Sequence, residues 1–137
     1  MFAVTLGLRE PARLLGEVRF TGVDPDFLTG VRRWLEAPLR GCTKSAVLGA
    51  AVVVGELTTN AFRHARPPFA VRLILPERRN VIRLEVHDAT APPAMDWSPG
   101  RGLDLVRALC LVWGVDHRDS GKVVWAELPL LVRPIVG

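Results

Sequence analysis

The stretch that decides the fold is Gly55 to Ala65, GELTTNAFRHA. If it is helical, Glu56, Asn60 and His64 project from one stripe, because each step of four residues turns by only about 40°. A carboxylate, a carboxamide and an imidazole then stand on a buried support, and Glu and Asn oxygens suit a hard cation such as Mg²⁺. The core side of the same helix is predicted to be apolar: Val47, Ala50, Ala51, Val54, Leu57 and Ala61.

Composition indicates one globular domain. With 137 residues and 49% hydrophobic content, the chain can bury a sizeable core, and its mean hydropathy of +0.22 argues against disorder. The net charge of +4 permits phosphate or acidic partners but is weak support for DNA binding. Cys42 and Cys110 have no zinc or CxxC spacing, so they are interpreted as free thiols in a reducing compartment.

No segment is typical of a targeting or membrane sequence. The N-terminus, MFAVTLGLREPAR, lacks the basic region of a signal peptide, and the longest apolar run, Ala46 to Val54, is far shorter than a membrane span. We therefore expect a soluble protein located in the cytoplasm.

Local patterns predict eight elements. Asp24-Pro25 is a good helix start, Thr43 is a plausible cap for a long helix from about Lys44 to His64, and Arg66-Pro67-Pro68 ends that helix. Alternating or mixed apolar runs predict strands over residues 14–20 (beginning at residue 4 at the earliest), 70–75, 80–88, 113–118 and 122–130. A third helix is predicted over residues 103–111. In the strand over 80–88, the side chains of Arg83, Glu85 and His87 share one face.

These elements predict an α+β fold, a two-layer sandwich in which a mixed, mostly antiparallel sheet of about five strands is covered by three helices. Residues 89–100, ATAPPAMDWSPG, interrupt the pattern with three prolines and no periodicity. A segment of this length is typical of a functional loop or lid.

Two further features could bind a ligand. Asp88 ends an apolar strand and could accept a hydrogen bond from an exocyclic amine, although a lone Asp caps a turn roughly four times as often. Gly100 and Gly102 precede a helix, where free amides suit a phosphate, although such glycines often only turn the chain. Arg101 between them could add a charge-assisted contact or be a solvated side chain.

The order of these motifs resembles that of the GHKL (Bergerat-fold) ATPase superfamily. Residues 56–64, ELTTNAFRH, look like its N box, Val86-His87-Asp88 like the start of the G1 box, and residues 100–103, GRGL, like the G2 box. Residues 121–128 occupy the place of the last core strand. The resemblance covers about residues 14–130, and the N box is its specific part.

The size of the chain indicates a branch of that superfamily. A freestanding single domain over residues 1–137, with no phosphoacceptor helical domain, is similar to the bacterial anti-sigma-factor serine kinases. The resemblance implies a histidine kinase-like ATP-binding domain that binds ATP and Mg²⁺, holds a sigma factor and phosphorylates an anti-anti-sigma partner on serine or threonine. It also implies that the protein can form a homodimer.

The resemblance further implies roles for individual residues. Asn60 would coordinate Mg²⁺, Glu56 would act as general base, and Asp88 would bind the adenine amino group. The other residues expected to line or border the nucleotide are Arg63, His64, Gly100, Arg101, Gly102, Leu103 and Lys122, the last as a phosphate contact.

Two departures from the family pattern leave alternatives open. Residues 89–93, ATAPP, replace the glycines that usually follow the G1 aspartate, and Lys122 and Val123 stand near the place of a common threonine. One alternative is therefore a non-catalytic, nucleotide-dependent protein-binding switch. Another is a basic nucleic-acid-binding domain with steeply salt-dependent affinity, although the arginines are spread over every element and do not line one helix.

Overall fold

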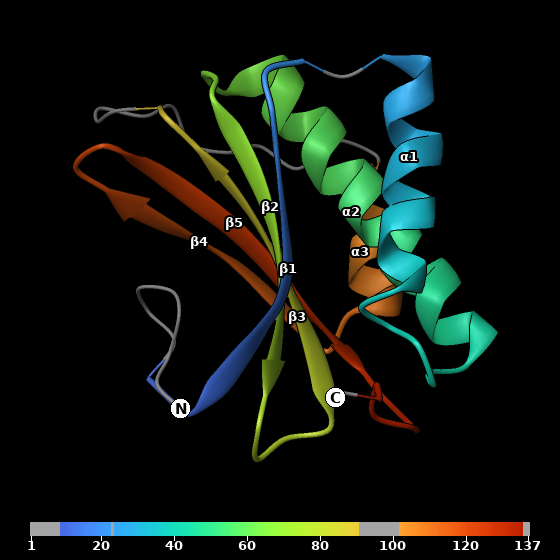
Figure 1. The fold of residues 1–137 in the computed structure, drawn as a ribbon. Helices are drawn as coiled ribbons and strands as arrows, with labels where there is room; N and C mark the ends of the chain where they lie inside the picture. The colour runs from blue at the N-terminus through green and yellow to red at the C-terminus, as the bar shows by residue number, and fades with distance from the viewer. Residues whose placement is uncertain (1–8, 23, 91–101, 136–137) are drawn as a thin grey trace.

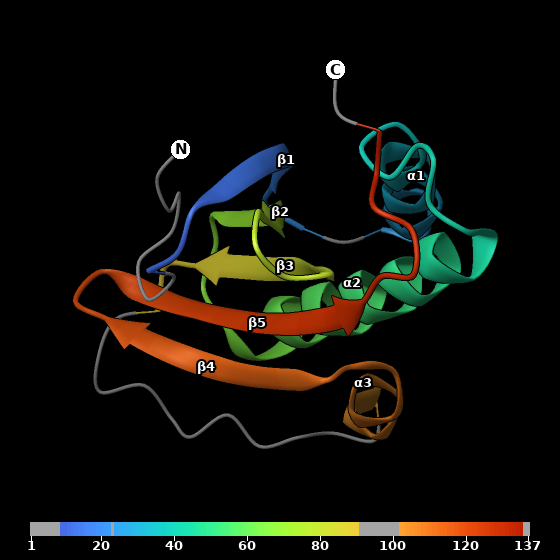
Figure 2. The same ribbon diagram turned by 90° about the horizontal axis from the view of Figure 1, so that it is seen from below.

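A computed structural model describes residues 9–22, 24–90 and 102–135. Its helices lie together on one side of a twisted sheet, as Figure 1 and the turned view in Figure 2 show. The elements in chain order are β1 (Ala12–Phe20), α1 (Pro25–Glu36), α2 (Lys44–His64), β2 (Phe69–Pro76), β3 (Val81–Asp88), α3 (Gly102–Leu109), β4 (Val112–Arg118) and β5 (Gly121–Pro129). The predicted α+β sandwich of five strands and three helices is confirmed.

The sheet is antiparallel throughout the described strands. Its order is β1-β2-β3-β5-β4, and each of the four neighbouring pairs is antiparallel, so the expected admixture of parallel strands is absent from this part of the chain. The connection through α3 returns the chain to the far edge, where β4 forms. The tight β4–β5 hairpin then places β5 next to β3, so two strands separated in sequence become central neighbours.

Helix starts follow the predicted capping residues. The Asp24 carboxylate accepts a hydrogen bond of 2.8 Å from the backbone N–H of Phe27 at the start of α1. The Thr43 hydroxyl accepts one of 3.1 Å from the N–H of Ala46 at the start of α2. Each cap satisfies an amide that has no partner within the helix, and this fixes both starting points.

Helix α2 is the central element of the helical layer and packs against α1, α3 and the sheet. With 21 residues and a hydropathy of 1.4 over its most apolar window, it is long and apolar enough to cross a membrane by those criteria alone. Its position against β2, β3 and β5 is that of the core helix of a globular domain. The apolar composition of α2 is therefore that of a helix packed at the centre of a domain.

The core lies between α2 and the inner face of the sheet. As predicted, Ala50, Val54, Leu57 and Ala61 are buried, whereas Val47 and Ala51 are only partly covered. Val53 and Thr58 are also buried, which the predicted face did not include. The buried arc of α2 is wider than one apolar stripe because the helix is flanked on both sides as well as from behind.

Element ends differ slightly from the predicted ranges. Helix α3 spans Gly102–Leu109, so it ends before the expected Leu111. The backbone N–H of Leu111 donates instead to the carbonyl oxygen of Glu127 at 2.9 Å, and this starts the pairing of β4 with β5. The proposed early start of the first strand at Val4 lies outside the described residues. Cys42 and Cys110 are both free, half-buried thiols.

The outer face of the sheet carries a buried network of charged residues. The Arg79 guanidinium donates to both oxygens of Glu127 at 2.7 and 2.8 Å, and Arg83 donates to Glu85 at 2.8 Å and to Glu127 at 3.4 Å. Burial by itself raises the pKa of the Glu127 carboxyl, but hydrogen bonds and charges from Arg79 and Arg83 outweigh that effect and hold its pKa below the ordinary value. These ion pairs connect the β2–β3 hairpin to β5.

Candidate nucleotide site

The predicted site residues of β3, β5 and α2 lie toward one end of the sheet. Figure 1 shows that β3 ends, β5 begins and α2 finishes at this same end of the fold. Backbone and side-chain bonds join these ends: Ala89 N–H donates to the Arg66 carbonyl at 2.9 Å, and Arg66 N–H donates to the Thr90 hydroxyl at 2.9 Å. The segment that follows α2 is therefore held against the segment that follows β3.

Asn60 is the buried polar residue of the N-box helix. It is only 9% exposed, and its side-chain Nδ2 has no hydrogen-bond partner among the described residues. Thr58, two residues earlier, is also buried but donates to the carbonyl of Val54 at 2.8 Å, so its hydroxyl is satisfied within the helix. An unsatisfied buried amide costs about 1–3 kcal/mol, which makes Asn60 a candidate for binding a ligand.

Asp88 and Lys122 form a buried ion pair. They are register partners at the end of β3 and the start of β5, and Lys122 Nζ donates to Asp88 Oδ2 at 2.6 Å. Asp88 Oδ1 accepts from the N–H of Thr90 at 2.8 Å. The structure therefore gives Lys122 a partner that the sequence prediction did not contain, which is the carboxylate expected to bind adenine.

A close backbone contact holds this pair in place. A Cβ added at Gly121 would collide with the carbonyl oxygen of Asp88, so only glycine fits at the first residue of β5. The side chain of Lys122, the next residue, reaches Asp88 because the two backbones approach so closely. The glycine is thus a part of the site that no motif had indicated.

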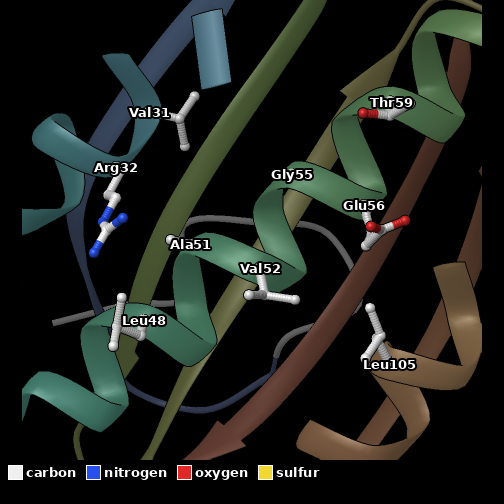
Figure 3. Close-up of a pocket in the computed structure, with 9 residues that line it drawn as sticks. All are labelled: Val31, Arg32, Leu48, Ala51, Val52, Gly55, Glu56, Thr59 and Leu105. Atoms are coloured by element: carbon white, nitrogen blue, oxygen red, sulfur yellow. The ribbon is translucent and has the colours of Figure 1, made fainter. Parts of the chain in front are cut away.

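Glu56, one turn before Asn60 on α2, lines a groove of about 410 Å³ on the outer side of the helical layer. Figure 3 shows its side chain on α2 next to Leu105 of α3, with Val31 and Arg32 of α1 on the other side of the groove. The remaining residues that line the groove are Leu48, Ala51, Val52, Gly55 and Thr59. No local pattern in the sequence predicts this groove, since its walls come from three separate helices.

The predicted stripe of Glu56, Asn60 and His64 therefore has three environments: half-buried, buried and exposed. His64 and Arg63 are both exposed in the last turn of α2. Each step of four residues rotates by about 40° around the helix. This rotation is enough to place Glu56 at the groove, Asn60 in the interior and His64 in solvent. Of the G2-box residues, Gly102 begins α3; Gly100, Arg101 and the Leu103 side chain lie outside the described part of the structure.

Comparisons with known proteins identify the family. A model of the histidine kinase-like ATPase domain matches residues 22–128, which is most of the chain and includes the N box, Asp88 and Lys122. None of the curated proteins compared with this chain matches it.

A solved structure has the same fold. The chain is similar to the histidine kinase domain of the blue-light-activated histidine kinase from Erythrobacter litoralis EL346, with a TM-score of 0.50 and 22% identity. The match covers 77% of this chain and 60% of that one, so this chain spans less than two thirds of its relative. At this identity the likeness shows the fold alone.

Three findings lead to the same family. They are the match to the family model, the order in which the N box, Asp88 and the next helix follow one another, and the five-stranded sheet under three helices. The anti-sigma-factor kinase branch fits the same family model, and membership supports ATP as the ligand. The chain therefore belongs to the histidine kinase-like ATPase domain family, within the GHKL superfamily.

Proposed function

We propose that this protein binds Mg²⁺–ATP between α2, the end of β3 and the start of β5, and that it is a cytoplasmic anti-sigma factor with serine/threonine kinase activity. The observation that carries the proposal is Asn60, whose buried Nδ2 has no partner among the described residues. A bound nucleotide phosphate would supply the missing acceptor. The partners implied are a sigma factor and an anti-anti-sigma protein.

The donor set fits a magnesium ion shared with a nucleotide. Within the described residues, no three His, Cys, Asp or Glu side chains gather as metal ligands. Mg²⁺ commonly takes only one or two protein oxygens and completes its shell with phosphate and water, so the Oδ1 of Asn60 would be its protein ligand here. Asp88 would accept a hydrogen bond from the base, and Lys122 would be close to the same ligand.

ATP would supply the transferable γ-phosphoryl group, and Mg²⁺ would neutralise its charge. Glu56 would act on the nucleophile, by accepting the proton of the attacking serine or threonine hydroxyl. It is half-buried at the wall of an open groove, where a side chain of a second protein can reach it. A hydroxyl-bearing segment that enters this groove would be the substrate.

Thermal unfolding with and without Mg²⁺–ATP tests the nucleotide site. At about a hundred times its dissociation constant, a ligand stabilises the native state by about 2.7 kcal/mol. In a domain of this size that raises the midpoint by about 5–10 °C. We expect the shift in the wild type, a requirement for magnesium, and no shift in Asn60→Ala.

Phe62→Ala is the matched control, since Phe62 lies on the same helix, half-exposed, on nearly the opposite side from Asn60. It should keep the full ligand shift, measured from its own midpoint without ligand. An equal shift in wild type and Asn60→Ala would remove Asn60 from the site, and no shift in the wild type would refute nucleotide binding.

A second candidate function is a switch that binds nucleotide and a partner without transferring phosphate. The sequence ATAPP at residues 89–93, which stands in place of the usual G1-box glycines, favours it. Incubation of candidate anti-anti-sigma proteins with γ-labelled ATP separates the two. Label on a partner serine or threonine supports the kinase, and binding without labelling supports the switch.

A further inference from the structure

The Asp88–Lys122 ion pair has more hydrogen-bonding capacity than the protein uses. The two side chains are 0% and 5% exposed, yet the Lys122 ammonium makes one hydrogen bond within the described residues although it has three donors. Each Asp88 oxygen accepts one bond and has a second lone pair. Buried charges are expensive unless these remaining positions are filled, so the pair is poised to bind a polar group.

The pair also has a defined pattern. Asp88 Oδ2 is an acceptor and Lys122 Nζ is a donor, and they are fixed 2.6 Å apart by strand register. An acceptor next to a donor is what an Asn or Gln carboxamide presents, and such a carboxamide reads adenine through its amino group and a neighbouring ring nitrogen. Adenine has a ring nitrogen acceptor on each side of its 6-amino group, at N1 and at N7.

We propose that Lys122 is a specificity-determining residue that reads the adenine base together with Asp88. The carboxylate accepts a hydrogen bond from the 6-amino group, and the ammonium donates one to the ring nitrogen beside it. A 6-oxo purine has an acceptor oxygen at the position where the carboxylate requires a donor, so the pair does not bind it in this orientation. This inference rests on the proposed nucleotide binding and adds a base contact that replaces the phosphate contact expected for Lys122.

The alternative is that Lys122 only neutralises Asp88. In that case the base touches the carboxylate alone, and the ring nitrogens of adenine contribute nothing through this lysine. The two possibilities differ in how the protein responds to single-atom changes of the ligand, which do not disturb folding.

The experiment is calorimetric binding of ATP, 1-deaza-ATP, 7-deaza-ATP and GTP to the full chain, with Mg²⁺. In the wild type, we expect one deaza analogue to bind about 10–100-fold more weakly than ATP, since it lacks an acceptor for a charged donor. The position of the nitrogen that matters identifies the edge that Lys122 reads. GTP should bind more weakly than ATP.

Lys122→Met completes the test by removing the ammonium and keeping most of the stem. We expect this variant to bind ATP about 10–100-fold more weakly than the wild type and to lose its discrimination against the sensitive deaza analogue. Lys44→Met is the matched control, because Lys44 is the other lysine of the chain and is exposed at the start of α2. It should bind all four nucleotides like the wild type.

Two results would overturn the inference. If the wild type binds ATP and both deaza analogues equally, Lys122 does not contact a ring nitrogen, and this holds even if Lys122→Met fails to fold. If Lys122→Met binds ATP as tightly as the wild type or more tightly, the lysine only pairs with the carboxylate. Both results leave the proposed ATP site standing, whereas absence of ATP binding by the wild type refutes the proposed function and this inference together.

Discussion

Gly121 packs so closely against Asp88 that a single methyl group at position 121 would collide with the Asp88 carbonyl oxygen. This contact joins the start of β5 to the end of β3 and sets the position of Lys122 opposite the Asp88 carboxylate. The shape of the candidate site thus depends on a residue with no side chain.

Gly121→Ala should therefore be destabilised and should bind nucleotide poorly. The added methyl meets backbone, which cannot rotate away, so the strands must separate at a cost of about 1–3 kcal/mol. Urea unfolding measures the free energy of unfolding, and the thermal shift with Mg²⁺–ATP measures the loss of binding. An unchanged stability would show that the strand ends adjust without strain.

Gly30→Ala is the control for this substitution. Gly30 lies within α1, and nothing is within 4 Å of the position that its Cβ would take. Alanine should stabilise the helix by about 0.5–1 kcal/mol because it restricts the unfolded chain and favours helix. The two glycine substitutions are thus predicted to have opposite signs.

Asn60→Leu should raise the free energy of unfolding of the ligand-free protein by about 1 kcal/mol. Leucine has a similar shape and removes the unpartnered Nδ2 from the buried site. The same variant should lose the Mg²⁺–ATP shift, so stability and binding would change in opposite directions. Urea unfolding without ligand is the measurement, and a loss of stability would mean that the amide already has a stabilising role.

Thr58→Val provides the contrast within the same helix. Its hydroxyl is buried and bonded to the Val54 carbonyl, so removing it should cost up to about 1 kcal/mol and not increase stability.

Glu56→Gln should separate binding from catalysis. Glutamine keeps the size of the side chain at the groove wall but cannot take a proton, so phosphoryl transfer to a partner protein should fall about 10²–10⁴-fold. The Mg²⁺–ATP thermal shift should persist, because Asn60 and Asp88 are untouched. Transfer of γ-label is the assay, and Glu36→Gln, which is exposed at the end of α1, is the control. Full activity in Glu56→Gln would require another base.

The free energy of unfolding should decrease at acidic pH, because Glu127 becomes protonated. Its pKa in the folded protein is depressed, so its contribution is fully present above the unfolded pKa of about 4.3 and is lost as the pH falls through the folded value. Glu127→Gln should be destabilised by about 1.5–3 kcal/mol at pH 7, because Arg79 and buried Arg83 each lose a charged acceptor and keep only their other one, Glu10 and Glu85 respectively. The difference from the wild type should shrink below about pH 4.

Urea unfolding at pH 7 and at about pH 3.5 checks this dependence. Glu77→Gln, in the exposed β2–β3 turn, is the matched control and should follow the wild type at both values. A constant difference between wild type and Glu127→Gln across this range would place the effect in packing and not in charge.

The order and type of the elements could be predicted from the sequence. Periodicity placed α2 over residues 44–64, where the structure has it, and alternation in β3 put Arg83, Glu85 and His87 on one face. These signals are local, because the repeat of a helix or a strand is set by the backbone of each residue and its near neighbours. The N box, which lies within one helix, could be read for the same reason.

Contacts between distant segments could not be predicted in this way. Lys122 and Asp88 are 34 residues apart, and their ion pair depends on β5 inserting beside β3 with one particular register. The groove at Glu56 likewise needs three helices to be placed around it. Neither arrangement leaves a periodic trace in the chain, since many registers and packings are compatible with the same local pattern.

The sequence by itself thus determined the helices, the strands and the candidate residues Glu56, Asn60 and Asp88. Only the tertiary structure decided their environments: a groove wall for Glu56, burial of Asn60 with no acceptor for its Nδ2 among the described residues, and an ion pair with Lys122 for Asp88. The physical reason is that residue type and spacing fix what a side chain can bind, whereas burial and partners depend on which distant segments fold against it.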